Sequence, residues 1–246
     1  DISKVEDLPV SVFRELNDQS TAFNAMLRAL RWFELYVPRK IVERLIKTGE
    51  VRDTISDARE ITVMFTDIAG FSAASEGMSA PEVAAFVNHH FFLVTKCIEA
   101  EDGTIDKFMG DAVMAFWGAP DIQSDGAERA CRAARAIAAA IHDDNRQRKT
   151  VGEPAVGIRI GIHTGMATVG NIGTPDRLNY TIIGDTVNIG QRLEQLGKKV
   201  YPAGTEVSIL VSGEVARQLK TNFGAVAAGR HKLKGRASEI EVFKLV

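Results

Sequence analysis

Two aspartates stand at the ends of apolar runs, where a buried charge is costly unless something binds it. Asp67 closes the run ITVMFTD, and Asp111 follows Gly110 between the apolar runs TIDKFM and AVMAFW. Carboxylates at neighbouring strand ends of one sheet can converge on a point, and such oxygens suit Mg²⁺ or Mn²⁺. The alternative for each aspartate is a turn residue that hydrogen-bonds the nearby backbone.

The residues after Asp67 favour a site for a phosphorylated ligand. The segment IAGFS offers consecutive backbone N–H groups at the start of a helical region, which is typical of anion sites. A metal beside a phosphate indicates a nucleotide, because Mg²⁺ is commonly held by one or two carboxylates plus substrate phosphates. The sequence contains neither GxxxxGK[ST] nor a GxGxxG between a strand and a helix, which disfavours P-loop and dinucleotide-binding proteins.

A second pair of polar residues shares one face of a predicted helix. Asn188 and Arg192 stand four apart in NIGQR, and residues at this spacing lie on the same side of a helix. Taken alone, the pair is also compatible with a helix cap and a surface arginine.

Alternating strands and helices must position these residues. Hairpins interrupt the alternation, which favours a mixed sheet with helices on one face over a doubly wound parallel sheet. The sequence predicts, in order, a strand at 61–68, a helix at 80–101, two strands around Gly110 at 103–118, a helix at 125–149, a strand with a glycine-rich exit at 156–173, a strand and a helix at 178–197, a strand and a helix at 206–219, and a hairpin at 231–246.

Five segments occur in an order that is specific to one family. They are VMFTDIAGFS, GTIDKFMGDAVMAFWG, GIRIGIHTG, YTIIGDTVNIGQRLE and KLKG. Over roughly residues 58–246 the chain thereby resembles the catalytic domain of class III nucleotidyl cyclases. The resemblance implies a fold that mixes helices and strands (α/β, and within it α+β): a ferredoxin-like βαββαβ core with extra strands. It also implies a homodimer with active sites shared between subunits.

The resemblance also implies a role for each matching residue. Asp67 and Asp111 match the two metal-binding aspartates, and the carbonyl of Ile68 joins them, so two divalent cations, Mg²⁺ or Mn²⁺, are expected over a triphosphate. Asn188 is implied to orient the ribose, and Arg192 to stabilise charge on the α-phosphate in the transition state. The implied phosphate contacts are Phe71, Ser72, Arg159 and Lys234.

Base selection is implied to rest on two positions. Lys107 matches the purine-selecting lysine, whose donor suits the N1 acceptor of adenine, whereas guanine presents a donor there. Thr181 matches a position that holds aspartate in many adenylyl cyclases and threonine in one bacterial subclass. Guanylyl cyclases carry glutamate and cysteine at these two positions, so ATP is the expected substrate. A hydroxyl can accept from the adenine 6-amino group but can also donate, so threonine discriminates less sharply than aspartate.

The expected activity is therefore that of an adenylyl cyclase, which converts ATP to 3′,5′-cyclic AMP and pyrophosphate. Two alternatives stay open: a guanylyl cyclase, against which Lys107 argues, and a catalytically silent nucleotide-binding or dimerisation module. Silent relatives usually lose the metal aspartates or the asparagine–arginine pair, and this chain keeps all four residues.

Residues 1 to about 50 are expected to be helical, within a signalling segment, 1–57, that precedes a catalytic domain at 58–246. An apolar stripe at heptad a/d spacing favours a parallel coiled coil in a dimer, and an amphipathic helix packed on its own domain is the alternative. The stripe comprises Phe13, Leu16, Ser20, Phe23, Leu27 and Leu30. Pro38 ends this helix, RKIVERLIKTG restarts it, and EVRDTISDARE is read as a linker.

Two N-terminal segments carry a further resemblance. STAFNAMLRAL resembles the closing helix of a HAMP signalling module, and YVPRKIVERLI resembles the short helix that leads into bacterial cyclase domains.

Composition sets the expectations about setting. A net charge of −2 does not indicate binding to nucleic acid. The sequence also contains no run of about 18 apolar residues, the length that could span a membrane. The two isolated cysteines and the lack of a signal peptide favour a reducing compartment. Because the chain begins at Asp1 rather than Met, we expect a cytoplasmic domain of a longer protein with an upstream sensor or membrane part, such as an inner-membrane protein.

Overall fold

The computed structural model describes residues 5–9, 11–34, 57–174, 176–202, 204–220, 223–234 and 238–245. The chain divides into two compact units, Asp1–Arg52 and Asp53–Val246, and each is described by itself. Among the described residues, no helix combines the length and the hydropathy that a membrane span requires.

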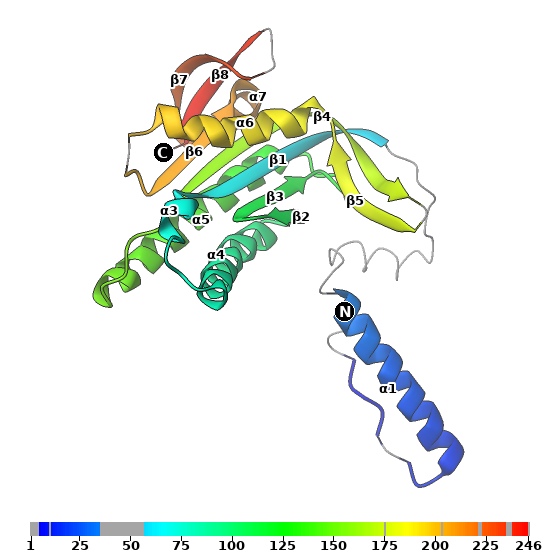
Figure 1. Cartoon of the computed structure of the whole chain (residues 1–246). Helices are drawn as coiled ribbons and strands as arrows, with labels where there is room; N and C mark the ends of the chain where they lie inside the picture. Colours follow the sequence, from blue (N-terminus) through cyan, green and yellow to red (C-terminus); the bar gives the residue numbers. More distant parts are fainter. Residues whose placement is uncertain are drawn as a thin grey trace. The chain divides into compact units, whose positions relative to one another are not determined.

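The larger unit is built on one mixed sheet with the strand order β2-β3-β1-β4-β6-β8-β7 (Figure 1). Its first six main elements follow the order strand, helix, strand, strand, helix, strand. They are β1 (Asp57–Ala69), α4 (Ala80–Ala100), β2 (Thr104–Met109), β3 (Ala112–Trp117), α5 (Gly126–Thr150) and β4 (Gly157–Thr174). The central neighbours β2–β3, β3–β1 and β1–β4 are all antiparallel. This is the ferredoxin-like βαββαβ core that the sequence predicted, and the prediction is confirmed.

Extra strands and helices extend this core, as expected. The strand β5 pairs with the outer part of β4, and β6 runs parallel to the inner part of β4. The strands β7 and β8 form a terminal hairpin, which β8 joins to β6, but β7 covers Ala225–Lys232 and so begins before the range 231–246 predicted for the hairpin. The added elements are α3 (Phe71–Ala74), β5 (Arg177–Ile183), α6 (Asp185–Val200), β6 (Val207–Ser212), α7 (Gly213–Gln218), β7 (Ala225–Lys232) and β8 (Glu239–Leu245).

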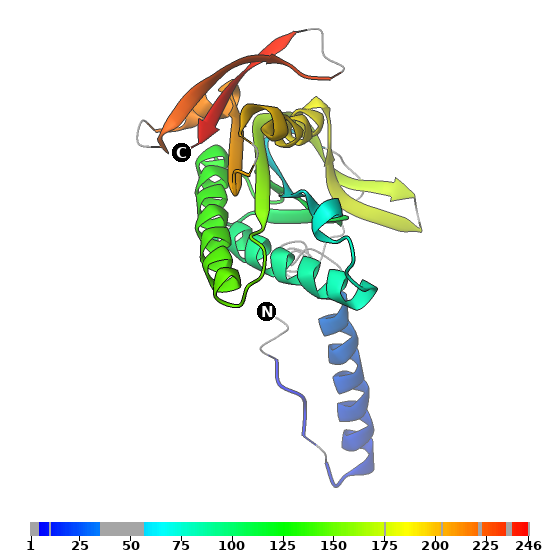
Figure 2. The ribbon, with the colours of Figure 1, turned by 60° about the vertical axis from the view of Figure 1, so that its left-hand side comes forward.

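Helices cover both faces of the sheet, so the prediction that they lie on one face was wrong. Successive side chains of β1 point to opposite faces. Met64 packs with α4 and α5 in one apolar cluster, while Val63 and Phe65 belong to a second cluster on the other face. The helix α6 contacts β4 and β1 on that second face, opposite α4 and α5 (Figure 2). A strand buried on both faces reads as a nearly continuous apolar run, which hides the second layer from the sequence pattern.

Two strands are longer than their apolar patterns indicated. Residues 57–60, assigned in the sequence to a polar linker, form the start of β1, where Asp57 pairs with Val169. The glycine-rich exit of the predicted strand at 156–173 also stays in β4, up to Thr174. Both extensions are held mainly by backbone hydrogen bonds to a neighbouring strand. Such bonds leave no hydrophobic pattern in the sequence when the side chains are exposed.

A close backbone contact fixes α6 against the sheet. A Cβ atom placed on Gly161 of β4 would lie 2.2 Å from the backbone nitrogen of Glu194 and 2.5 Å from the carbonyl oxygen of Gly190. A Cβ atom on Gly190 of α6 would lie 2.8 Å from a methyl carbon of Val63. The two glycines therefore let the helix lie directly on β4 and β1, which sets the height and phase of α6.

The smaller unit contains the helix α1 (Arg14–Glu34) and the segment that leads into it. The expectation of helix from residue 1 was wrong for residues 5–9 and 11–13, which are not helical. Pro9 restricts the residue before it to extended backbone, and the side-chain amide of Asn24 bonds both backbone groups of Leu8, at 2.8 and 2.9 Å. The predicted second helix and most of the linker, residues 35–56, lie outside the described residues.

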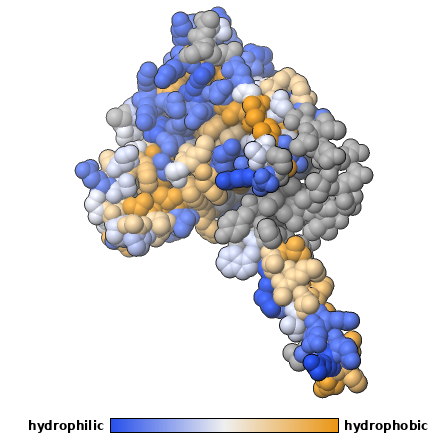
Figure 3. Space-filling view, turned by 45° about the vertical axis from the view of Figure 1, so that its right-hand side comes forward, coloured by the Kyte–Doolittle hydropathy of each residue, from blue (hydrophilic) through white to orange (hydrophobic). Residues whose placement is uncertain are grey.

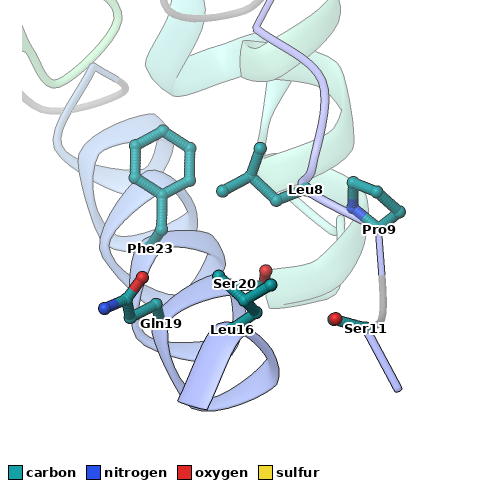
Figure 4. A pocket seen from close by; sticks show the side chains of 7 residues that line it. All are labelled: Leu8, Pro9, Ser11, Leu16, Gln19, Ser20 and Phe23. Atoms are coloured by element: carbon teal, nitrogen blue, oxygen red, sulfur yellow. The ribbon is translucent and has the colours of Figure 1, made fainter. Parts of the chain in front are cut away.

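An open hollow of about 480 Å³ lies between the leading segment and α1. Figure 4 shows Leu8, Pro9 and Ser11 on one side of it, and Leu16, Gln19, Ser20 and Phe23 on α1. Of the heptad stripe, Leu27 is buried, whereas Phe13, Leu16 and Leu30 are exposed. Apolar side chains therefore reach the surface along this unit, as they do in part of the larger unit (Figure 3). The coiled coil stays a prediction.

The contact between α6 and β4 yields a test of the fold. Gly161→Ala should lower the free energy of unfolding by roughly 1–3 kcal/mol or more, because its methyl group meets helix backbone that cannot move aside. Urea unfolding followed by circular dichroism measures the change.

Gly152→Ala is the control, because a Cβ atom there meets nothing within 4 Å and only its φ of 76° is unfavourable. The control should lose about 1 kcal/mol. Equal losses in the two variants would contradict the close packing of α6.

Candidate active site

The structure brings Asp67 and Asp111 together at one edge of the central strands. Asp67 lies near the end of β1, one residue beyond Thr66, which pairs with Val113 of β3. Asp111 immediately precedes β3, so the antiparallel register places the two carboxylates opposite each other, close enough to share a hydrogen bond. The sequence indicated that these two strand ends could converge, and in the structure they do. That the pair binds a metal stays a prediction.

The electrostatics of this pair favour a bound cation. Burial, followed by the contact with Asp67, raises the pKa of Asp111 to about 6. Burial, and then the neighbouring charge of Glu194, also raises the pKa of Asp67. Two carboxylates that face each other in a half-buried place cannot both carry charge cheaply unless a positive group lies between them.

Arg159 supplies a positive group in this structure. Its side chain is 8% exposed, its Nε donates to Glu194 Oε1 at 2.8 Å, and its Nη2 donates to a carboxylate oxygen of Asp67. Arg159 and Asp67 are also register partners on β4 and β1. The guanidinium therefore holds together side chains from β1 and α6. The family resemblance implied a phosphate contact for this residue, and that contact stays a prediction.

The oxygen ligands present fit a divalent cation whose remaining ligands come from a substrate and water. Within the described ranges, no group of three or more histidine, cysteine or acidic side chains has the geometry to hold a metal by itself. Asp67 and Asp111 supply two carboxylates, and the backbone N–H of Ile68, the residue after Asp67, approaches Asp111. Mg²⁺ is commonly bound by one or two carboxylates with phosphate oxygens and water completing its shell.

The predicted phosphate loop follows Asp67 directly. Gly70 has a φ of 77°, a left-handed conformation that glycine adopts without strain, and it precedes the short helix α3. Phe71 stacks on Phe86 of α4, with ring centroids 6.2 Å apart and planes 2° from parallel. Ser72 is exposed in the first turn of α3. The stacking anchors the loop beside the two aspartates.

Lys107 and Thr181 meet at a different place, around Asp106. Lys107 lies on β2 with 45% of its side chain exposed, and its Nζ lies 3.2 Å from Asp106 Oδ2. Thr181 lies on β5 and is 8% exposed. Its hydroxyl approaches Asp106 closely enough to lower the pKa of that carboxyl, against the larger effect of burial. The two residues expected to read the base are therefore part of one cluster.

The remaining predicted residues lie on the outside of the larger unit. Asn188 is exposed and Arg192 half-buried on α6, whereas Ile189 and Leu193, on its inner side, are buried. Lys234 is exposed in the connection between β7 and β8. Their implied roles toward ribose and phosphate stay predictions.

Sequence reasoning missed two acidic residues that the structure places in these clusters. Glu194, the partner of Arg159, is 6% exposed and stands in an otherwise apolar position of α6. Asp106 is adjacent to Lys107 in a strand, where neighbouring side chains normally point to opposite faces. In both cases the sequence held one signal that could have revealed the residue: it is acidic and stands at a position where the pattern predicts a buried side chain.

The ion pairs of Arg159 yield a second test. Arg159→Leu should lower the free energy of unfolding by about 3–5 kcal/mol at pH 7.5 without metal, because it leaves buried carboxylates without their cation. The measurement is urea unfolding. Arg146→Leu is the matched control, since the pair Arg146–Asp143 is largely exposed, at 73% and 61%, and should contribute at most about 1 kcal/mol. A loss no greater than that of the control would contradict the role of Arg159.

Comparison with known proteins identifies the family of the chain. The family described as "Adenylate and Guanylate cyclase catalytic domain" matches residues 54–246. Adenylate cyclase 1 of Rhizobium meliloti (strain 1021) is 38% identical over 99% of this chain and 37% of that protein. The crystal structure of the adenylyl cyclase CyaB from P. aeruginosa has a TM-score of 0.68 and 33% identity, covering 78% of this chain and 96% of that chain.

A guanylyl cyclase is structurally as similar. The crystal structure of the guanylyl cyclase Cya2 also has a TM-score of 0.68, with 30% identity over 77% of this chain and 93% of that chain. The chain spans less than half the length of the first curated relatives it matches, 37% in one case and 46% in another. Given the extent of the family match and the identity to Adenylate cyclase 1, this chain belongs to the adenylate and guanylate cyclase catalytic domain family.

Proposed function

We propose that this chain is the catalytic part of an adenylyl cyclase, which converts ATP to 3′,5′-cyclic AMP and pyrophosphate. The observation that carries the proposal is the convergence of Asp67 and Asp111 at adjoining strand ends, beside the loop at Gly70. The similarity to adenylate cyclases supports it. Cya2 shows that likeness of fold does not select the base, so the choice of ATP rests on Lys107 and Thr181.

Members of this family use divalent metals, and we propose two Mg²⁺ or Mn²⁺ ions here. Asp67 and Asp111, with the carbonyl of Ile68, would hold them. When bound, such ions make the ribose 3′-hydroxyl more acidic and neutralise the phosphates and the pyrophosphate leaving group. The loop at Phe71 and Ser72 lies beside these residues and would bind phosphate through its backbone N–H groups.

The other residues of the chain position the substrate and stabilise charge. Asn188 would orient the ribose, and Arg192, one helical turn further on α6, would face the charge that develops on the α-phosphate. Removing one such electrostatic donor costs an enzyme about 2.7–4 kcal/mol of transition-state stabilisation. Arg159 and Lys234 would contact the outer phosphates, and Arg159 would keep its bond to Glu194 while doing so.

We propose that the active site is shared between two copies of the chain. Asp67 lies against both Asp111 and Arg159, whereas Lys107 and Thr181 lie around Asp106, so one chain presents two half-sites. Large apolar side chains are also exposed on the catalytic unit, as expected of a surface that a second copy covers. They include Phe92, Phe108, Met166, Leu178 and Ile183.

The N-terminal unit would serve the same dimer. Leu16 and Leu30 are exposed on α1, and a parallel coiled coil would bury them. Since the chain spans less than half of its curated relatives, we propose that residues 1–57 connect the catalytic domain, 58–246, to an upstream sensor or membrane part, with the catalytic domain in the cytoplasm.

Activity assays with ATP and with GTP, in Mn²⁺, test the proposed reaction. Wild type should form cyclic AMP, and both Asp67→Ala and Asp111→Ala should lose turnover while keeping the fold, as circular dichroism would show, because each removes a metal carboxylate. Asp121→Ala, at an exposed position, is the control and should retain full activity. Cyclic GMP as the main product would indicate the guanylyl alternative, and turnover by Asp67→Ala at the wild-type rate would refute the metal assignment.

Mixing two inactive variants tests the shared site. Asp67→Ala and Arg192→Ala homodimers should each be inactive. In the shared site, Asp67 would come from one copy and Arg192 from the other. A mixed dimer therefore places both lesions in one site and leaves the other intact, so random exchange should restore up to about a quarter of wild-type activity. Co-purification of differently tagged chains shows whether exchange occurred. Exchange without any recovery of activity would place the whole site within one chain.

A further inference from the structure

Asp106 occupies a β-bulge in β2. The register with β3 pairs Ile105 with Ala115 and Lys107 with Met114, so Asp106 is an extra residue on its strand. A bulge of this kind re-aims side chains that would otherwise alternate between the faces of the sheet. It explains how two consecutive residues, Asp106 and Lys107, bring their charged groups to 3.2 Å.

The Asp106 carboxylate is buried without its full set of hydrogen bonds. Its side chain is 1% exposed, and within the described residues neither carboxylate oxygen has a hydrogen bond of good geometry. The hydroxyl oxygen of Thr181 is in the same condition. Buried polar groups are nearly always paired, so two such groups beside each other indicate a site that a ligand completes.

The identity of the ligand follows from the neighbours. Asp106 has contacts with Lys107 and Thr181, the two residues proposed to read the purine. A threonine hydroxyl is ambiguous toward a base because it can donate or accept. The 6-position is an amino donor in adenine and a carbonyl acceptor in guanine. Thr181 by itself therefore gives little discrimination between the two bases.

We propose that Asp106 is a specificity-determining positioning residue, which accepts the hydroxyl proton of Thr181 once a nucleotide is bound and so leaves the Thr181 oxygen as an acceptor toward the adenine 6-amino group. An ionised carboxylate can only accept, so it fixes the direction of the hydroxyl. The same carboxylate attracts the Lys107 ammonium, which still has protons to donate to adenine N1. In this way a threonine gains the selectivity that an aspartate at position 181 would have. The inference rests on the proposed adenylyl cyclase function.

Asp106→Asn reverses this logic with little change in shape. The Lys107 ammonium lies beside Oδ2 and favours the amide oxygen, which turns the amide NH₂ toward Thr181. The Thr181 hydroxyl would then accept from the amide and donate to the base, which suits guanine O6. The ratio of kcat/KM for ATP to that for GTP should fall about tenfold or more, since hydrogen bonds to charged groups are the stronger ones.

Two readouts measure this change. One is the kcat/KM ratio, and the other is the ratio of dissociation constants for 3′-deoxy-ATP and 3′-deoxy-GTP, which lack the hydroxyl needed for cyclisation. Asp121→Asn, at an exposed position, is the matched control and should keep the wild-type ratios. Thermal unfolding checks the fold. If Asp106→Asn does not fold, Asp106→Ser also removes the charge and should lower the same ratios.

The pair Asp106 and Thr181 allows a double-mutant cycle. Thr181→Val should lower the adenine preference, and adding Asp106→Asn to it should lower that preference much less than Asp106→Asn does alone, because most of its effect passes through the hydroxyl. Losses in the double variant equal to the sum of the two single losses would show that Asp106 acts independently of Thr181 and would overturn the proposal. Equal losses with ATP and GTP in Asp106→Asn would also overturn it, since they indicate a structural role.

The results separate this inference from the proposed function. If wild type prefers ATP and Asp106→Asn keeps that preference, the role of Asp106 is refuted and the adenylyl cyclase proposal stands. If wild type prefers GTP or neither nucleotide in both assays, the proposed substrate is wrong and the inference about Asp106 falls with it.

Discussion

The catalytic unit depends on the ion pairs made by the buried guanidinium of Arg159. This residue lies on β4 and binds Asp67 of β1 and Glu194 of α6, so one cation connects two strands and a helix that come from distant parts of the chain. The close contact of Gly161 with the backbone of α6 makes this reach possible. Because α6 also carries Asn188 and Arg192, the ion pairs that seat Glu194 fix the residues proposed to act on the ribose and the α-phosphate.

The same interaction shapes the proposed metal site. Asp67 and Asp111 face each other with raised pKa values, and burial is the leading cause for both. Arg159 offsets part of that unfavourable charge on the Asp67 side. A divalent cation would offset the rest, which explains why the fold tolerates two half-buried carboxylates at this edge of the sheet. Stability and function therefore make opposite demands on these residues, and charge compensation reconciles them.

The cluster around Asp106 shows a second way of placing charge. Here a bulge, rather than a long-range ion pair, brings a carboxylate beside Lys107, and the outer strand β5 adds Thr181. Asp106 and Lys107 stand only a few positions before Asp111, on the strand β2 that leads into the turn at Gly110. A protein with two incomplete clusters of this kind is suited to assembly from two copies, since each copy can supply the cluster that the facing half-site needs.

The sequence by itself predicted the order of the strands and helices and placed Asp67 and Asp111 at the ends of strands, because apolar periodicity and glycine turns are local signals. The tertiary structure alone decided that residues 57–60 continue β1, that α6 covers the second face, that Glu194 binds Arg159, and that Asp106 sits in a bulge. Each of these depends on strand register or on a partner distant in the chain. A one-residue change of register reverses the face of every side chain, and no local pattern records which register is adopted.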